Sequence, residues 1–573
     1  MRMKLLASLF LALPLAALAG PYEDSIAALN KREFDSALSL LRPLAEQGDP
    51  RAENLLGNLY RAGTGVAQDQ AAAAGWYEKA AAQDYAAAAN NLANLYWYGT
   101  GVPKDEAKAV ELFKKAADQG FAPAQTAMGN LSLAGTGMKQ DDHAAADYYR
   151  RAAEQGNAVA QHSLAGLYWL GKGVEKDDAQ AVHWFKLAAD QGLEGAEIAL
   201  ANLYRAGRGT EQNYQEARRL YQKAADQGNA EAQNLLGMLY WQGEGVPADP
   251  DKALQLFRTA AERGNSAAEN SLGTLYYEGR GVAQDDAQAA HWLKLAADQG
   301  VANADYLLGV LAQEGRAQDQ SFEEAARRYR KAADKGFPAA ENALGNLYWH
   351  GKGVEADPAQ AIAWYRKAAD HGLTDAQTSL GTIYWLGKGV AKDDAEAVKW
   401  FQLAAGRGQP YAENMLANFL YSGVGVTQDK AAAMGWLHKS AEQNFAVAEN
   451  SLGLIYWRGE GVEKNESEAV NWFRRAAEHN LPAAQNSMAF LYSNGVGVEK
   501  DPAEAAKWLR RAAEQGSADA ETQLGDQYLK GIGVPADYDE GVKWLRKAAQ
   551  QGQEHAKETL ALLREDFQAP AHD

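Results

Sequence analysis

The stretch Ala343–Gly372, ALGNLYWHGKGVEADPAQAIAWYRKAADHG, decides the fold, because nearly all of the chain repeats it. Its Leu344 has an equivalent every 36 residues in both directions, from Leu56 to Leu560, and no insertion or deletion interrupts this spacing. A fixed period of this length is the signature of a solenoid, in which each repeat packs against its neighbours. The same regularity leaves no singular position that would mark an active site.

Each repeat is predicted to form two amphipathic helices joined by a glycine turn. In the first helix, Ala52, Leu56 and Leu59 recur on one face of a 3.6-residue helix, and the Ala52 position is alanine in all fifteen copies. The alanine predicts that two helix backbones approach closely there. Gly63 is placed to end the first helix with a positive φ, and the side chain of Asp69 to cap the second helix.

The pattern A-x-x-x-L-G-x-x-Y-x-x-G-x-G-V-x-x-D-x-x-x-A-x-x-W-x-x-x-A-A-x-x-G resembles the Sel1-like repeat, a relative of the tetratricopeptide repeat. The resemblance covers about 49–552 and predicts fourteen repeats. It implies an all-α fold, a right-handed superhelical α/α solenoid of 36-residue helical hairpins. Members of the family act as adaptors, adhesins, immunity partners and signalling scaffolds, so the resemblance fixes the architecture better than the function.

Residues 1–19 are expected to form a secretory signal peptide. A basic start precedes the apolar run Leu5–Leu15, and Ala17–Ala19 forms an A-x-A cleavage motif. We therefore expect cleavage after Ala19, a periplasmic or secreted mature protein, and no membrane insertion. The chain has no cysteine, which excludes disulfide bonds and a lipid-modified cysteine.

The two ends of the array depart from the repeat. Residues 20–48 are expected to form a degenerate N-terminal capping hairpin whose second helix is interrupted by Pro43. Residues 553–573 are expected to form a capping helix and a tail. Both assignments follow from the need of a solenoid to cover its terminal repeats.

The repeat 308–336 is degenerate. It has Ala312 in place of the tyrosine of the first helix and Arg328 in place of the tryptophan of the second helix. Because the stability of a linear array is a sum over repeats and their neighbours, the loss of two large packing residues predicts a flexible joint between Gln313 and Phe322.

Composition and motifs argue against catalysis and against nucleic acid. The formal net charge of −18 repels phosphate backbones and anionic lipid surfaces, so a protein or peptide is the expected partner, and a basic one is the more natural. No G-x-S-x-G, H-E-x-x-H or phosphate-loop motif is present. Among the ten histidines, His183 shares a register with His291 and His371 with His479, but the members of each pair lie three repeats apart, too far to share a metal ion. We expect no enzyme activity, no cofactor and no metal.

One stripe of polar and aromatic side chains is the candidate binding surface. Asparagines recur two and six positions after the invariant alanine of the first helix, and aromatic residues or arginine nine positions after it. These offsets lie on one face of a helix, which in the solenoid that the family implies lines the concave groove. The candidate residues are Asn54, Asn58, Arg61, Asn90, Asn94, Trp97, Trp169, Asn202, Arg205, Asn234, Trp241, Asn270, Tyr277, Asn342, Asn346, Trp349, Trp385, Asn414, Asn418, Tyr421, Asn450 and Trp457, and Asn130 and Asn486 hold the same registers.

Two interpretations of this amide–aromatic stripe stay open. Asparagine in the middle of a helix costs roughly 0.5–0.7 kcal/mol relative to alanine, so helix formation does not explain it. The amides either hold an extended peptide backbone or bond one another and knit the repeats together. The first interpretation predicts a non-enzymatic scaffold of the bacterial cell envelope with an adaptor, regulator or immunity-type role. The alternative is a secreted adhesin or virulence factor that binds a host protein, and an enzyme of the β-lactamase-like kind is disfavoured.

Overall fold

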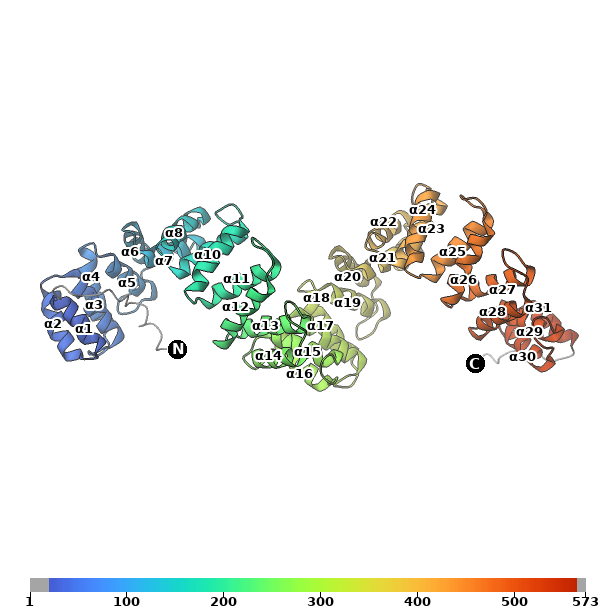
Figure 1. Ribbon diagram of the computed structural model, residues 1–573, viewed down its shortest axis with the longest axis horizontal. Coiled ribbons are helices and arrows are strands. Elements are labelled where there is room, and N and C mark those ends of the chain that lie inside the picture. Colours follow the sequence, from blue (N-terminus) through green and yellow to red (C-terminus); the bar gives the residue numbers. More distant parts are fainter. Residues whose placement is uncertain (1–19, 564–573) are drawn as a thin grey trace. The chain divides into compact units, whose positions relative to one another are not determined.

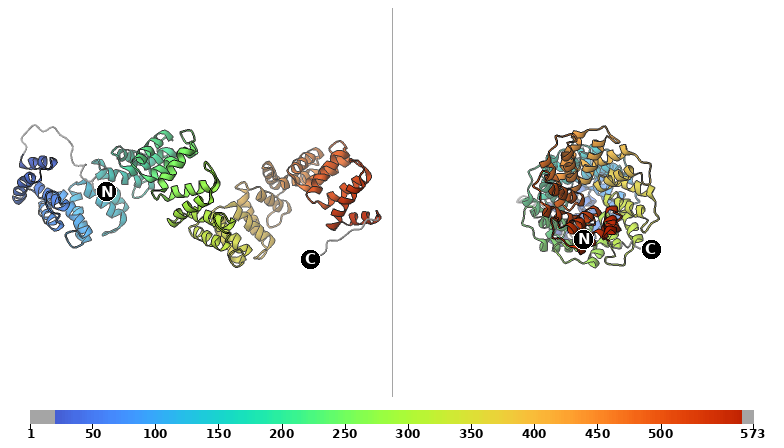
Figure 2. Two further views of the ribbon diagram at one scale, coloured as in Figure 1. Left: turned by 90° about the horizontal axis from the view of Figure 1, so that it is seen from below. Right: turned by 90° about the vertical axis from the view of Figure 1, so that its right-hand side faces the viewer.

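The computed structural model describes residues 20–563. The chain divides into two compact units, Met1–Leu272 and Gly273–Asp573, and the described residues form 31 α-helices. Within each unit the helices pair into hairpins that follow one another in chain order (Figures 1 and 2). The predicted fold class, an all-α array of 36-residue helical hairpins, is confirmed. The expected signal peptide lies outside the described residues, as does the tail after the last helix.

Each hairpin consists of a first helix and a second helix. The first helices are α1 (Pro21–Asn30), α3 (Pro50–Ala62), α5 (Ala86–Tyr98), α7 (Ala122–Ala134), α9 (Ala158–Leu170), α11 (Glu194–Ala206), α13 (Ala230–Gln242), α15 (Ser266–Glu278), α17 (Ala302–Glu314), α19 (Pro338–His350), α21 (Thr374–Leu386), α23 (Pro410–Ser422), α25 (Ala446–Arg458), α27 (Pro482–Asn494) and α29 (Ala518–Lys530). The second helices are α2 (Phe34–Glu46), α4 (Gln70–Ala82), α6 (Glu106–Asp118), α8 (Asp142–Glu154), α10 (Asp178–Asp190), α12 (Tyr214–Asp226), α14 (Pro250–Ala261), α16 (Asp286–Asp298), α18 (Phe322–Ala333), α20 (Pro358–Asp370), α22 (Asp394–Ala405), α24 (Lys430–Glu442), α26 (Glu466–Glu478), α28 (Pro502–Glu514) and α30 (Tyr538–Gln550). Helix α31 (Glu554–Leu562) follows alone.

The predicted turn chemistry is confirmed. Gly63 ends α3 in the left-handed region with φ 69°, and its N–H donates to the carbonyl of Leu59. The carboxylate of Asp69 caps α4 by accepting from the N–H of Ala72 at 2.9 Å. Local interactions of this kind depend on a few neighbouring residues, which explains why the repeat pattern predicts them correctly.

The second glycine of several turns allows the turn to lie close to the backbone of the preceding repeat. Gly173 has φ 68°, and a Cβ atom added there would lie 2.0 Å from the carbonyl oxygen of Asp142, at the start of α8. Added Cβ atoms at Gly209 and Gly533 would meet the equivalent carbonyls at 2.1 and 2.0 Å. At these three positions glycine is therefore favoured both by its backbone conformation and by close contact with the neighbouring repeat.

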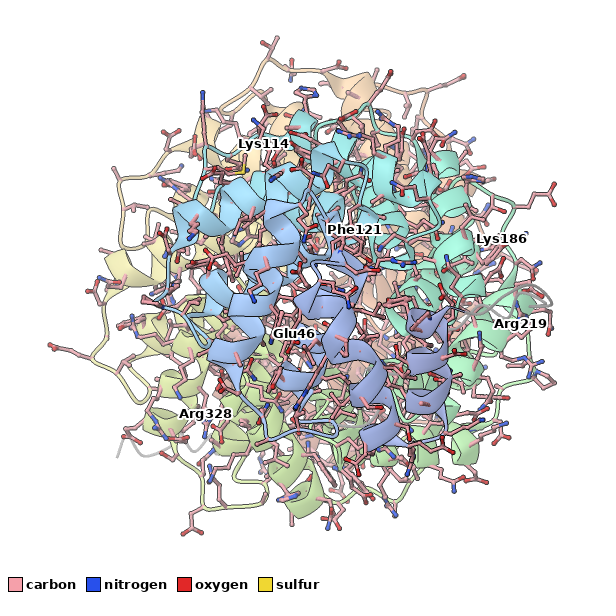
Figure 3. All side chains as sticks on the ribbon, turned by 90° about the vertical axis from the view of Figure 1, so that its left-hand side faces the viewer. Glu46, Lys114, Phe121, Lys186, Arg219 and Arg328 are labelled. Atoms are coloured by element: carbon pink, nitrogen blue, oxygen red, sulfur yellow. The ribbon has the colours of Figure 1, made fainter. Side chains whose placement is uncertain are left out.

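The core runs between the helices as a continuous layer of small and aromatic side chains. The invariant alanine is fully buried in every copy from Ala52 to Ala556, as the close helix contact predicts. Tyr77 and its equivalents in the second helix are also buried and pack on the glycine that follows the core leucine of the first helix. Lys114 and Lys186, which are labelled in Figure 3, are exposed side chains of the second helices α6 and α10.

The hairpin of α1 and α2 and the lone helix α31 lie at the two ends of the array, where capping elements are expected, and one expected detail of α2 is wrong. Pro43 does not interrupt α2, which continues to Glu46. Proline lies in the last turn of this helix, and its own carbonyl still accepts from the N–H of Gln47 at 3.0 Å. The helix loses one N–H donor without ending, because only the donor side of Pro43 is missing.

The degenerate repeat 308–336 forms a hairpin like the others, α17 and α18. Tyr329 is 1% exposed and packs 5.7 Å from the ring of Tyr306, while Arg328 forms an ion pair with Asp305. The boundary between the compact units lies elsewhere, at Leu272–Gly273 within α15. The loop from Gln313 to Phe322 does contain one unusual residue, Ala317, whose φ is 64°. The flexible joint in this loop stays a prediction.

Candidate functional site

The amide–aromatic stripe lies along the first helices, and its three registers differ in burial. The register of Asn54 is the most enclosed, and that of Asn58 is the most open. Buried members are Asn54, Asn234 and Asn414; half-buried members are Asn58, Asn90, Asn94, Trp97, Arg205, Trp241, Asn270, Tyr277, Asn342, Trp349, Tyr421, Asn450, Trp457 and Asn486; exposed members are Arg61, Asn130, Trp169, Asn202, Asn346, Trp385 and Asn418. The stripe therefore combines enclosed amides with accessible side chains.

Four of the six asparagines in the register of Asn58 bond a tyrosine of the second helix of their own repeat. The other two, Asn94 and Asn418, have Phe113 and Leu437 at the position of the tyrosine. The hydroxyl of Tyr77 donates to Oδ1 of Asn58 at 2.8 Å, and that of Tyr365 donates to Oδ1 of Asn346 at 2.7 Å. Burial raises the pKa of Tyr77 and of Tyr365 to about 12, so each hydroxyl stays a neutral donor at physiological pH. The same bond joins Tyr149 to Asn130 and Tyr221 to Asn202. These amides hold the hairpin together.

The asparagines in the register of Asn54 are different, because most of their carbonyl oxygens are left without a donor. Oδ1 of Asn54 accepts from Nδ2 of Asn91 in the next repeat at 3.0 Å, which is the knitting bond that the sequence allows. Five equivalents have a buried Oδ1 that accepts no hydrogen bond within the described chain, namely Asn234, Asn342, Asn414, Asn450 and Asn486. A buried acceptor without a donor costs free energy, so a donor that reached any of these five atoms would stabilise the repeat.

The arginine and aromatic members of the stripe contact the following repeat. Nε of Arg205 bonds Glu244 at 2.7 Å, and the hydroxyl of Tyr421 donates to Glu460 at 2.6 Å. Trp457 packs edge-to-face on a phenylalanine of the next first helix, with 6.2 Å between ring centroids. Trp169 and Trp385 keep 42% and 36% of their surface exposed. The stripe is continuous across these repeat junctions and retains accessible aromatic surface.

A second column of polar residues, which sequence reasoning missed, lies inside the hairpins. The residue after the invariant alanine is buried in fourteen copies; it is Glu, Gln or Asp in thirteen of them and alanine, Ala89, in the other. We call this the buried acid–amide column; it consists of Glu53, Gln125, Gln161, Glu197, Gln233, Glu269, Asp305, Glu341, Gln377, Glu413, Glu449, Gln485 and Glu521. Most members bond the residue thirty positions later, at the end of the second helix of the same repeat. The available signal was the recurrence of Glu, Gln or Asp directly after an invariant core residue.

The partner in the second helix varies with the column member. Nε2 of Gln83 donates to Glu53 at 2.8 Å, whereas a histidine ring nitrogen, Nδ1 of His371, bonds Glu341 at 2.8 Å. His371 and His479, which share a register, therefore share this structural role. The buried column stabilises each hairpin and is not accessible to a partner.

Comparison with known families now places the chain. The model of one family, described as Sel1 repeat, matches fourteen consecutive segments. The chain belongs to the Sel1 repeat family. The matched segments are 50–85, 86–121, 122–157, 158–193, 195–229, 230–265, 266–301, 302–337, 338–373, 374–409, 410–445, 446–481, 482–517 and 518–553. Each Sel1 repeat corresponds to one helical hairpin, from α3 and α4 to α29 and α30.

Solved structures of other Sel1 repeat proteins resemble this chain. One is a protective antigen present in uropathogenic Escherichia coli strains, which displays an SLR fold; it is 30% identical, the match covers 87% of this chain and 99% of that one, and the TM-score is 0.53. Another is a Sel1 repeat protein from Oxalobacter formigenes, 34% identical over 60% of this chain and 89% of that one, with a TM-score of 0.39. The immunity protein Pa5087 from Pseudomonas aeruginosa is 24% identical over 37% of this chain and 81% of that one, with a TM-score of 0.27. No curated protein matches the chain.

Two further properties bear on the Sel1 array as a whole. Between residues 20 and 563, no three His, Asp or Glu side chains come together in a way that could bind a metal ion. Over the same span, none of the helices combines the length and the apolar character that crossing a lipid bilayer requires.

The buried column of the Sel1 repeats makes stability depend on pH. Burial raises the pKa of Glu413, whose ordinary value is 4.5, although Lys439 and Gln443 act in the opposite direction. A carboxyl with a raised folded-state pKa favours folding below about pH 4.5 and loses this contribution as the pH rises through its folded-state value. We expect Glu413→Gln to stabilise the protein by about 1 kcal/mol near neutral pH and to have no advantage near pH 4. Urea denaturation at the two pH values measures the difference.

The glutamines of the same column supply the control. Gln485 accepts from Gln515 at 2.9 Å and also donates to the carbonyl of Ala477 at 3.1 Å, a bond that an ionised glutamate cannot make. Gln485→Glu should therefore destabilise the protein near neutral pH and regain stability on acidification. If the effect of Glu413→Gln were the same at both pH values, charge burial would not be its cause.

Proposed function

We propose that this Sel1 repeat protein is a non-enzymatic scaffold of the bacterial cell envelope that binds a protein or peptide through the amide–aromatic stripe. The single observation that carries the proposal is the set of five buried asparagine oxygens without a donor. An extended peptide backbone offers N–H donors at regular intervals, which is the chemistry that these acceptors lack. The neighbouring aromatic and arginine side chains are of the types enriched at protein interfaces.

The role within the envelope follows from where the mature protein resides. An adaptor, a regulator or an immunity-type protein would act in the periplasm, which agrees with the signal peptide expected over residues 1–19. A secreted adhesin or virulence factor is the second candidate, and it is favoured by the similarity to a protective antigen present in uropathogenic Escherichia coli strains. Immunoblotting of periplasmic, membrane and culture-supernatant fractions separates the two roles.

The binding role of the stripe is tested best by substituting Asn342 and Trp349 together. Oδ1 of Asn342 lacks a donor and Trp349 is half-buried beside it, whereas Asn346 is committed to Tyr365. We expect the double substitution Asn342→Ala, Trp349→Ala to reduce capture of the partner from periplasm and supernatant at least about tenfold, as loss of an aromatic anchor does. The measurement is quantitative affinity capture on the immobilised protein, in which the variant is compared with the wild type.

Two control variants accompany this experiment. Gln360→Ala changes an exposed side chain on a second helix and should leave capture unchanged. Asn346→Ala should lower the melting temperature, because it leaves the buried hydroxyl of Tyr365 without its acceptor. Equal capture by the wild type and the Asn342, Trp349 double variant would contradict the proposed function at this junction.

A further inference from the structure

A small hollow is lined by side chains of the first helices α25 and α27 and by one residue of the second helix α26 between them. Figure 1 shows where these three helices lie along the chain. Its volume is about 260 Å³. The lining residues are Leu454, Trp457, Phe473, Asn486, Ser487, Phe490 and Leu491. Two of these, Leu454 and Phe490, occupy the register in which other repeats carry asparagine, so the stripe becomes locally apolar here.

The wall of the hollow contains exposed aromatic surface. Phe490 is 52% exposed although it is a large apolar side chain, and the ring of Trp457 packs against it. Exposed aromatic side chains beside a depression are typical of interface anchors, where a residue of the partner completes the packing.

One polar atom in the wall indicates what the occupant must offer. Nδ2 of Asn486 donates to the hydroxyl of Ser517 at 3.0 Å. Oδ1 of the same amide is buried and accepts no hydrogen bond within the described chain. An occupant that satisfies the site therefore brings an N–H group next to an apolar group.

The volume of the hollow and the net charge of the chain further restrict which ligands can occupy the hollow. Sites for small-molecule ligands and cofactors usually measure about 300–1,000 Å³, and this hollow is smaller, so it suits a single large side chain. A side chain joined to a backbone N–H is a residue of a polypeptide. Because the chain carries a formal net charge of −18, a segment with basic flanking residues is attracted and an acidic one is repelled.

We propose that the hollow binds a large aliphatic or aromatic side chain of an extended, basic segment of a partner protein. The backbone N–H beside that side chain donates to Oδ1 of Asn486, and Trp457 and Phe490 enclose the side chain. This inference rests on the proposed function and specifies the partner that the stripe accepts.

Short designed peptides test whether binding requires the large side chain and whether it requires basic flanking residues. We use fluorescein-labelled peptides with the sequences KKLKK, KKGKK and EELEE, and we follow binding to the full-length protein by fluorescence anisotropy. KKLKK is expected to bind at least about tenfold more tightly than KKGKK, because one leucine side chain leaves water. EELEE is expected to bind more weakly than KKLKK. Equal affinity for KKLKK and KKGKK would overturn the proposal, and equal affinity for KKLKK and EELEE would overturn its requirement for basic flanks.

A pair of substitutions ties the leucine preference to this hollow. Ser487→Leu fills it, and the register tolerates leucine because Leu55 and Leu235 occupy it in other repeats. Ser451→Leu makes the same change in the neighbouring repeat, away from the hollow. The preference for KKLKK should disappear in Ser487→Leu and persist in Ser451→Leu; persistence in both would overturn the assignment to this hollow. If the peptides show no preference while partner capture still depends on Asn342 and Trp349, the proposed function stands and only this inference fails.

Discussion

Gly173→Ala is expected to lower the free energy of unfolding by about 2–4 kcal/mol, although it adds a single methyl group. The backbone there has φ 68°, which costs an alanine about 1–2 kcal/mol. The added Cβ atom would also lie 2.0 Å from the carbonyl oxygen of Asp142, so the preceding repeat must move. Urea denaturation followed by far-UV circular dichroism measures the loss, and it should appear in the first transition because the array unfolds from its weakest junction.

Gly156→Ala is the matched control for this substitution. Gly156 also has a positive φ, 85°, but an added Cβ atom would meet nothing within 4 Å. Gly156→Ala is therefore expected to lose stability only through backbone strain, which is about half of the loss expected for Gly173→Ala. If the two variants were equally destabilised, the contact between neighbouring repeats would carry none of the cost.

The substitution Ala317→Gly tests the same argument in the opposite direction, because it replaces an alanine in the left-handed region with glycine. Ala317 occupies the register of the second turn glycine and has φ 64°. Ala317→Gly should stabilise the protein by about 0.5–1 kcal/mol, because the relief of left-handed strain exceeds the entropy that a glycine adds to the unfolded chain. A loss of stability would show that the loop had adapted fully to alanine.

The fold could be predicted from the sequence because each element depends on local chemistry that is repeated many times. The helix-ending glycine at Gly63, the cap at Asp69 and the buried alanine at Ala52 all lie where the 36-residue pattern predicts them. A single copy would leave helix ends uncertain by a few residues. With fourteen copies, a chance substitution in one repeat does not obscure the pattern.

The candidate site was harder to predict, because it depends on which side chains meet across helices. The asparagines at Asn58 and Asn346 were grouped with those at Asn54, but they bond buried tyrosines nineteen residues later. A signal existed: four of the five tyrosines in that second-helix register have an asparagine nineteen residues earlier, and Tyr329 is the exception. Periodicity assigns residues to a face, but the choice of bonding partner follows from the distance between helices, which the pattern does not contain.

The buried acid–amide column was missed for a related reason. Glutamate and glutamine on a helix are ordinarily exposed, so the sequence predicts that the residue after the invariant alanine is in contact with solvent. In the structure Glu341 is 1% exposed and bonds His371 thirty residues later. Burial of a polar residue in thirteen copies can be explained only when the second helix is seen to provide its partner.

Arg328→Trp is expected to destabilise the degenerate repeat by about 3 kcal/mol, even though tryptophan is the common residue in this register. Arg328 bonds Asp305 at 3.1 Å and Glu324 at 2.9 Å, and Asp305 is only 1% exposed. Its removal leaves the buried carboxylate of Asp305 with Lys335, 3.5 Å away, as its remaining ion-pair partner. Breaking a buried ion pair costs about 3–5 kcal/mol, and the remaining lysine places this case at the lower end.

The double variant Arg328→Trp, Asp305→Gln should recover most of the lost stability. It restores the tryptophan–glutamine combination of other repeats, in which Gln485 accompanies Trp508. Replacing both members of a buried ion pair with residues that pack and bond well is often neutral or stabilising, whereas replacing one member is not. Urea denaturation of the wild type, both single variants and the double variant forms a complete thermodynamic cycle. A double variant no more stable than Arg328→Trp would show that the two residues do not depend on each other and that the degenerate repeat has a different stabilising contact.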